Sequence, residues 1–115
     1  MQIIVSSFSK EAATKSKGLV LKDKIERGLK QSEDISVDFS GIDRFASPFF
    51  NNSFAALALK YGFKKIGDIS CLNLSEVGKD AYEASMDNAR MLSSSPEFAD
   101  EMNKIIRETP KNTEE

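Results

Sequence analysis

Residues 37–50, VDFSGIDRFASPFF, contain the end of a strand, a turn and the start of a helix in succession. Apolar and polar side chains alternate over residues 35–39, which is typical of a strand with one buried face. The dipeptide Ser40-Gly41 ends this strand. Ser47-Pro48 then predicts a helix start, because serine caps free backbone amides and proline is tolerated in the first turn. We therefore expect a strand that leads through a short loop into a helix.

The remaining elements follow from hydrophobic spacing and capping residues. A helix is expected where a capping side chain precedes an apolar stripe, and a strand where β-prone residues are bounded by polar ones. The order β-α-β-α-β-α-α predicts an α/β fold in which a layer of helices packs on a small mixed sheet. The expected elements are strands at 2–8, 35–39 and 65–70, and helices that start at Thr14 or Ser16, run from Ser47 to Gly62, start at Ser75, and cover 98–106.

The chain has 115 residues, of which 40% are apolar and 30% are charged. This length suits one domain with its own core, because domains cluster at about 100–150 residues. Residues 109–115 carry no apolar anchor. We expect a single domain over residues 1–93, a helical appendage over 94–108 that packs on the domain or contacts a partner, and a flexible tail over 109–115.

Residue types limit the chemistry that the chain can perform. It has no histidine and a single cysteine, Cys71, which is expected to be an inert packing residue. Ser-His and Cys-His nucleophile pairs and a zinc site are therefore excluded, and we expect a protein that is not an enzyme and uses no cofactor or metal. No apolar run reaches the roughly 20 residues of a membrane span, and a basic signal-peptide start is missing. The expected location is the cytoplasm, without membrane contact.

Charge is divided unevenly along the chain. Residues 1–65 hold 11 basic and 7 acidic side chains, whereas residues 66–115 hold 5 and 11, and the formal net charge is −2. Folding could turn this division into one basic and one acidic face, but an ordinary solvated surface is the simpler interpretation. The basic residues do not form a cluster interleaved with aromatic ones, so nucleic acid is not an expected partner.

Two polar residues of the opening stretch are candidates for local hydrogen bonding, and one of them also has a functional interpretation. Ser47 is either a plain helix cap or a hydroxyl that contacts a ligand or is modified, because a helix start favours anions and phosphate. Asp38 closes the strand and is expected to accept amides from the following turn. Spacing alone does not decide between the two interpretations of Ser47.

The start of this helix also carries aromatic and amide side chains. Phe49 lies about 100° around the helix from Phe50, which belongs to the apolar stripe. Phe49 therefore either packs under the preceding loop or is exposed as an anchor for a partner. Asn51 and Asn52 either bind a ligand or a partner's backbone, or are polar residues of a first helical turn.

The segments Val37–Ile42 and Phe45–Phe49 together resemble the STAS-like family DUF4325, which is related in pattern to bacterial anti-sigma-factor antagonists. The resemblance spans residues 19–89. It implies a sheet-and-helix domain that docks on a protein. In the antagonists a serine at this helix start is phosphorylated by a kinase of the histidine-kinase-like ATPase fold, which blocks docking. Here Pro48 replaces the usual serine, and Ser47 lies one position earlier.

The resemblance leads to two functional hypotheses. The first is a non-catalytic regulatory module that docks on a protein, such as a histidine-kinase-like ATPase or kinase, through the helix that starts at Ser47. The alternative is a domain that binds a small ligand or nucleotide at the same helix N-terminus. A homo-oligomer is compatible with either. The expected partner-binding residues are Ser40, Arg44, Ser47, Phe49, Asn51 and Asn52, with Ser47 as the phosphorylation site.

Overall fold

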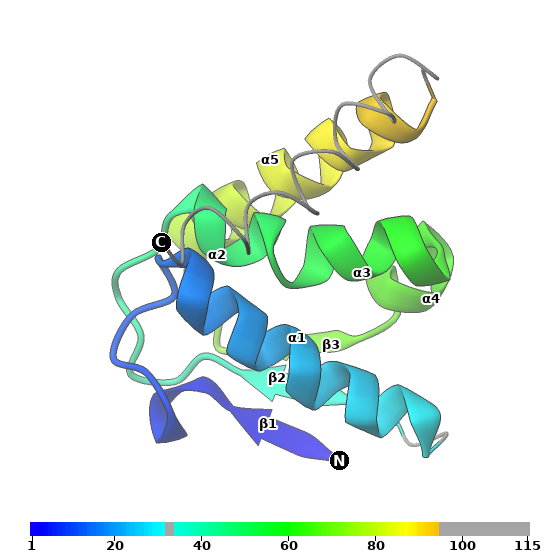
Figure 1. Ribbon diagram of the computed structural model, residues 1–115. Helices are drawn as coiled ribbons and strands as arrows, with labels where there is room; N and C mark the ends of the chain where they lie inside the picture. The colour runs from blue at the N-terminus through cyan, green and yellow to red at the C-terminus, as the bar shows by residue number, and fades with distance from the viewer. Residues whose placement is uncertain (32–33, 95–115) are drawn as a thin grey trace.

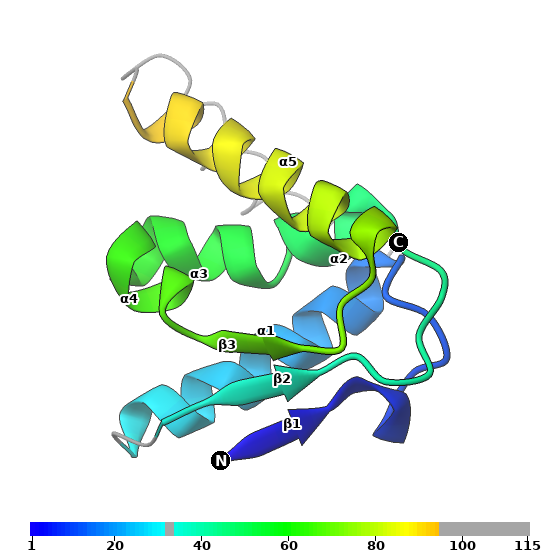
Figure 2. The ribbon, with the colours of Figure 1, turned by 180° about the vertical axis from the view of Figure 1, so that it is seen from behind.

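The computed structural model describes residues 1–31 and 34–94. A three-stranded sheet forms one layer, and helices pack on one of its faces (Figure 1). Figure 2 shows the opposite side, where the described helices leave the sheet uncovered. The elements are, in chain order, β1 (Gln2–Ile4), the short 3-10 helix η1 (Val5–Ser7), α1 (Lys15–Lys30), β2 (Ser36–Asp38), α2 (Ser47–Asn51), α3 (Phe54–Tyr61), α4 (Phe63–Gly67), β3 (Ser70–Leu72) and α5 (Glu76–Ser93).

The strand order is β1-β2-β3, and both pairs are parallel. Val37 is aligned with Ile3 on one side and with Cys71 on the other, so the two buried positions and the partly buried Cys71 share one face. The expected α/β class is confirmed. The described sheet is parallel rather than mixed. Each pair of strands is joined by a helical crossover, which returns the chain to the end of the sheet where the previous strand began.

Aromatic side chains fill the space between the sheet and the helices. Phe39, Phe49, Phe50 and Phe54 are all fully buried. The ring centroids of Phe49 and Phe50 lie 5.2 Å apart in an edge-to-face arrangement, and Phe39 lies 6.0 Å from Phe50. Burial of each such side chain stabilises the fold by roughly 1.5–3 kcal/mol. The stretch that predicted the strand and helix therefore also supplies the centre of the core.

Capping residues begin and end several helices as the sequence predicts. The Thr14 hydroxyl accepts a hydrogen bond from the Lys17 amide at 3.3 Å, and the Ser75 hydroxyl accepts one from the Gly78 amide at 3.2 Å. Gly62, at φ 103°, ends α3 in a backbone conformation that glycine adopts readily. At these positions, residues close in sequence are sufficient to fix where each helix begins or ends.

The helix expected from Ser47 to Gly62 is divided into α2 and α3. The Ser53 hydroxyl donates to the Phe49 carbonyl at 2.8 Å, and the Asn52 side-chain amide donates to the Pro48 carbonyl at 2.8 Å. These bonds occupy carbonyls near the break, and Ser53 is fully buried within it. Serine and asparagine compete in this way with the regular helical pattern.

The third strand lies later in the chain than the sequence analysis predicts. Most of the expected strand at 65–70 belongs to α4 and the turn after it, whereas β3 covers Ser70–Leu72. Ile66 and Ile69 are both buried, and their separation of three residues suits one face of a helical turn rather than a strand. Residues 95–115, which include nearly all of the expected appendage and the whole expected tail, lie outside the described residues.

Candidate functional site

The three parallel strands end at one edge of the sheet, and the loops that leave this edge lead into α1, α2 and α5 (Figure 2). The carboxyl ends of the strands in open parallel sheets are the usual position of a binding site. Four exposed residues, Ser40, Arg44, Ser47 and Asn73, lie in the loops or at the helix start after β2 and β3. We call these four residues the carboxyl-edge surface.

A hydrogen-bonded cluster joins two of these loops. Asp38 Oδ1 accepts bonds from the Ser40 amide at 2.9 Å, the Ser40 hydroxyl at 2.8 Å and the Asn73 side-chain amide at 2.9 Å. The Asn73 amide also lies 2.8 Å from the Ser40 hydroxyl oxygen. The prediction that Asp38 binds the following turn is confirmed, and the same carboxylate additionally fixes the loop after β3.

The cluster also sets the charge and backbone geometry of this edge. Hydrogen bonds from Asn73 first, and then from the amide and hydroxyl of Ser40, lower the pKa of Asp38 below its ordinary value. Asn73 has φ 58°, a left-handed conformation that asparagine tolerates better than most residues. Its side chain is thus held toward Asp38 by a backbone turn that few other residues favour.

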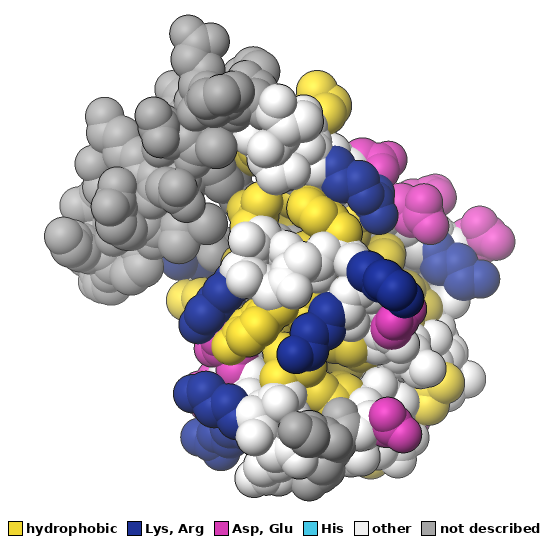
Figure 3. All heavy atoms as spheres, turned by 90° about the vertical axis from the view of Figure 1, so that its right-hand side faces the viewer, with side chains coloured by type: hydrophobic (Ala, Val, Ile, Leu, Met, Phe, Trp, Pro, Cys, Tyr) yellow, Lys and Arg dark blue, Asp and Glu magenta, His cyan; other side chains and the backbone are white. Residues whose placement is uncertain are grey.

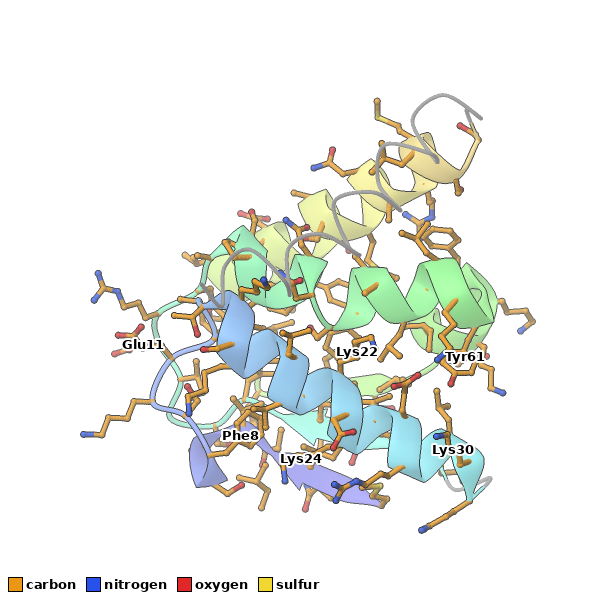
Figure 4. All side chains as sticks on the ribbon, in the orientation of Figure 1. Phe8, Glu11, Lys22, Lys24, Lys30 and Tyr61 are labelled. Atoms are coloured by element: carbon orange, nitrogen blue, oxygen red, sulfur yellow. The ribbon has the colours of Figure 1, made fainter. Side chains whose placement is uncertain are left out.

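A second set of contacts holds the loop that contains Arg44. The Ala12 amide donates to the Arg44 carbonyl at 2.9 Å, and the Ala46 amide donates to the Ala12 carbonyl at 3.0 Å. The Arg44 guanidinium lies 3.6 Å from the Glu11 carboxylate, and Arg44 is 74% exposed. Figure 4 shows Glu11 on the outside of this edge. The backbone is therefore fixed, whereas the guanidinium remains available, because an exposed ion pair contributes only about 0–1 kcal/mol.

Ser47 is exposed at the first residue of α2, and the residue in the capping position is Ala46. The interpretation of Ser47 as a helix cap is therefore wrong. Ala46 has an extended backbone and provides no side-chain cap, so the helix start relies on Pro48, whose fixed φ suits the first turn. The Ser47 hydroxyl is left accessible.

Phe49 is 0% exposed, so its assignment as a partner-binding residue is wrong and the packing alternative is correct. Its ring contacts Phe39 edge-on at 6.4 Å and Phe50 at 5.2 Å. The close approach of α1 explains this burial, because a Cβ at Gly18 would lie 2.5 Å from the Phe49 carbonyl oxygen. The absence of a side chain at Gly18 therefore lets α1 cover the start of α2.

The other predicted site residues do not all join the carboxyl-edge surface. Ser40, Arg44 and Ser47 lie on one exposed segment between β2 and α2. Asn51 and Asn52 lie at the far end of α2 and are half-buried. The hydrogen bond from the Asn52 amide to the Pro48 carbonyl gives this side chain a local structural role.

Asn73 was not among the residues singled out by sequence. It is 35 residues from Asp38 along the chain, and only the parallel pairing of β2 with β3 brings the two together. The available signal was a short polar residue directly after a strand and two residues before the Ser75 cap. The sequence analysis places the third strand at 65–70, so Asn73 is not recognised as the residue that directly follows it.

Two further features of the described part of the chain concern its cysteine and its potential metal ligands. Burial raises the pKa of the Cys71 thiol to about 11, which keeps it protonated and poorly nucleophilic. Within residues 1–31 and 34–94, no three histidine, cysteine, aspartate or glutamate side chains gather as metal ligands. None of the described helices is long and apolar enough to cross a membrane.

Comparison with protein families gives a match over the central part of the chain. The model of a STAS-like domain of unknown function, DUF4325, matches residues 17–78, which is more than half of the chain. The chain belongs to the DUF4325 family of STAS-like domains. The matched part of this STAS-like domain runs from α1 to the start of α5 and contains all four residues of the carboxyl-edge surface. Comparison with curated proteins and with solved structures gives no significant match.

Proposed function

We propose that this STAS-like domain is a non-catalytic regulatory module that binds a protein partner through the carboxyl-edge surface. The observation that carries the proposal is the hydrogen-bonded cluster of Asp38, Ser40 and Asn73. It fixes two loops of the exposed edge in one arrangement. A surface that is already ordered loses less conformational entropy on binding, so more of the contact energy contributes to affinity.

The chemistry of the edge supports recognition of a polar protein surface. Ser47 offers a hydroxyl group, and Arg44 offers a guanidinium whose planar donors suit a carboxylate. The donors of Ser40 and Asn73 are engaged within the cluster, and their oxygen atoms can still accept bonds. Arg44 and its neighbour Glu11 are both partly exposed, so a partner carboxylate can compete for the guanidinium. Backbone contacts of Arg44 and Ala46 with Ala12 keep the segment in place during this exchange.

The proposed partner is a protein of the histidine-kinase-like ATPase or kinase type, and Ser47 is the proposed site of phosphorylation. The resemblance to anti-sigma-factor antagonists and the exposure of Ser47 at the start of α2 support this part of the proposal. A phosphate adds a charge of about −1.5 to −2 near neutral pH. On Ser47, three positions from Arg44, it would change both the charge and the shape of the docking surface.

The proposal is tested by capture of partners from a lysate of the source organism, with and without ATP. Wild type is compared with Arg44→Glu, which reverses a charge on the carboxyl-edge surface. The matched control is Arg27→Glu on α1, because Arg27 also forms an exposed ion pair, with Asp23 at 3.0 Å. We expect Arg44→Glu to reduce capture by about tenfold or more, because charge reversal places like charges against a complementary partner.

Mass spectrometry identifies the captured protein and measures phosphate on Ser47. An ATPase or kinase that is retained by wild type and Arg27→Glu, but lost with Arg44→Glu, supports the proposed function. Equal capture of the same proteins by all three chains would show that the carboxyl-edge surface is not the docking site. Phosphate on Ser47 that releases the partner would support the proposed regulation.

A further inference from the structure

The end of the domain formed by α1, α3 and α4 carries lysines around a tyrosine. The Lys60 and Lys65 ammonium groups lie 5.2 and 5.7 Å from the centroid of the Tyr61 ring. Figure 4 shows Lys22 and Lys30 on α1 toward the same side as Tyr61, and Figure 3 shows dark-blue side chains gathered over this end with apolar ones between them. We define the lysine surface as Lys22, Lys30, Lys60, Lys64 and Lys65.

One carboxylate of this end already accepts bonds from three donors. Glu26, whose side chain is 14% exposed, accepts bonds from Lys60 at 2.7 Å, from the Tyr61 hydroxyl at 2.9 Å and from Lys22 at 3.4 Å. These groups, with the Lys60 bond as the largest cause, lower the pKa of Glu26 to about 2. Glu26 therefore stays ionised and neutralises one charge, but it is recessed below the lysine ammonium groups.

The positive charge of the lysine surface exceeds the negative charge paired with it. Asp68 lies 3.5 Å from Lys64, and both side chains are largely exposed. Glu26 and Asp68 are the carboxylates that form ion pairs with these five lysines in the described part of the chain. The five lysines thus outnumber the two carboxylates paired with them, on a chain whose total formal charge is −2. Unpaired ammonium groups attract negatively charged groups.

Acidic residues of α5 limit the width of the lysine surface. Arg90 stacks on Phe63 of α4 at 5.3 Å and donates to Asp87 at 2.8 Å, so an acidic side chain of α5 lies next to this end. Figure 3 shows magenta side chains bordering the dark-blue ones. A duplex nucleic acid is wide enough to meet this acidic border, whereas an extended peptide is narrow enough to avoid it.

We propose that the lysine surface is a second interaction surface, which binds an acidic segment of a protein partner. Its lysines offer ammonium groups to the side-chain carboxylates of the bound segment. The Tyr61 ring and neighbouring apolar atoms pack against the backbone of that segment between the carboxylates. Figure 1 shows α4 at the opposite end of the domain from the loops into which β2 leads. The lysine surface and the carboxyl-edge surface can therefore be occupied at the same time.

The test measures binding of a fluorescent peptide of about ten residues that alternates Glu and Ser, long enough to cross this end of the domain. Wild type is compared with the double variant Lys64→Gln and Lys65→Gln, in which Glu26 and its partners are intact. The matched control is Lys10→Gln with Lys79→Gln, which removes two exposed lysines elsewhere. We expect about three- to tenfold weaker binding for the first pair and unchanged binding for the control.

Circular dichroism and thermal melting confirm that both double variants are folded. Higher salt should weaken binding of the peptide to wild type, and a peptide with Gln in place of Glu should not bind. Three results would overturn the proposal: no binding of the acidic peptide at low salt, equal losses in the two double variants, or tighter binding of a single-stranded oligonucleotide of the same charge.

Discussion

Two carboxylates of this STAS-like domain each accept three hydrogen bonds, yet they stabilise different kinds of structure. Glu26 lies between two helices, is mostly buried and accepts bonds from ammonium groups and a phenol. Asp38 lies at the exposed edge of the sheet and accepts bonds from Ser40 and Asn73. The first position favours stability of the fold, whereas the second fixes loops that are free to meet a partner. Burial, rather than the number of bonds, separates the two roles.

The largest expected effect comes from a residue of the aromatic core, which provides the reference for the effects of the two carboxylates. Phe49→Ala should lower the free energy of unfolding by about 3–5 kcal/mol, because it leaves a cavity among buried aromatic rings. Chemical denaturation measures the loss. Ser47→Ala is the control and should change stability by less than about 0.5 kcal/mol, since this side chain is exposed. Similar stability of the two variants would contradict the assignment of Phe49 to the core.

An intermediate effect is expected when the buried carboxylate is neutralised. Glu26→Gln should cost about 1.5–3 kcal/mol at neutral pH, the range for a hydrogen bond to a charged group. Folding lowers the pKa of Glu26 from 4.5 to about 2, so its contribution is complete above pH 4.5 and is lost as the pH falls toward 2. The difference in stability between wild type and Glu26→Gln should therefore shrink over that interval in acid denaturation curves.

Asp23→Asn provides the matched control for the buried carboxylate. Asp23 also pairs with a basic residue four positions away on α1, but both side chains of this pair are exposed. Its contribution should be only about 0.2–0.5 kcal/mol. If Asp23→Asn and Glu26→Gln lost the same stability at pH 7, burial would not distinguish the carboxylates of this domain.

A smaller effect on global stability than that of Glu26→Gln is expected from Asp38→Ala. Loss of the carboxylate should release the turn at Ser40 and the loop at Asn73 while leaving the core packed. Amide hydrogen exchange should become faster in residues 40–46 and 73–75 and stay unchanged in α1. Asn73→Gly, which keeps the left-handed backbone accessible, should reproduce the faster exchange near Ser40. Uniformly faster exchange over the whole chain would mean that Asp38 supports the fold rather than the loops.

Local signals predicted much of the fold. The strand at β2, the caps at Thr14 and Ser75 and the end of a helix at Gly62 depend on neighbouring residues, and the structure confirms them. The third strand is predicted too early because Ile66 and Ile69 are interpreted as strand residues. In the structure Ile66 lies in α4 and Ile69 in the turn that follows it, and both are buried. Hydrophobic content alone does not separate these two periods in a short segment.

Sequence analysis predicted only the part of the candidate site that lies on one continuous segment of the chain. Ser40, Arg44 and Ser47 follow one another in sequence, and all three are exposed. Phe49 was misassigned because its environment depends on the approach of Gly18 from α1, a contact between distant residues. Asn73 was missed for the same reason, since parallel strand pairing alone places it beside Asp38.

The central claim is that the carboxyl-edge surface docks on a protein partner. The most direct measurement is the affinity of the captured partner for purified wild type, Arg44→Glu and Arg27→Glu, all at one ionic strength. The account predicts that Arg44→Glu binds about tenfold or more weakly, while Arg27→Glu matches wild type. Equal affinities for Arg44→Glu and wild type, with both proteins folded, would contradict it.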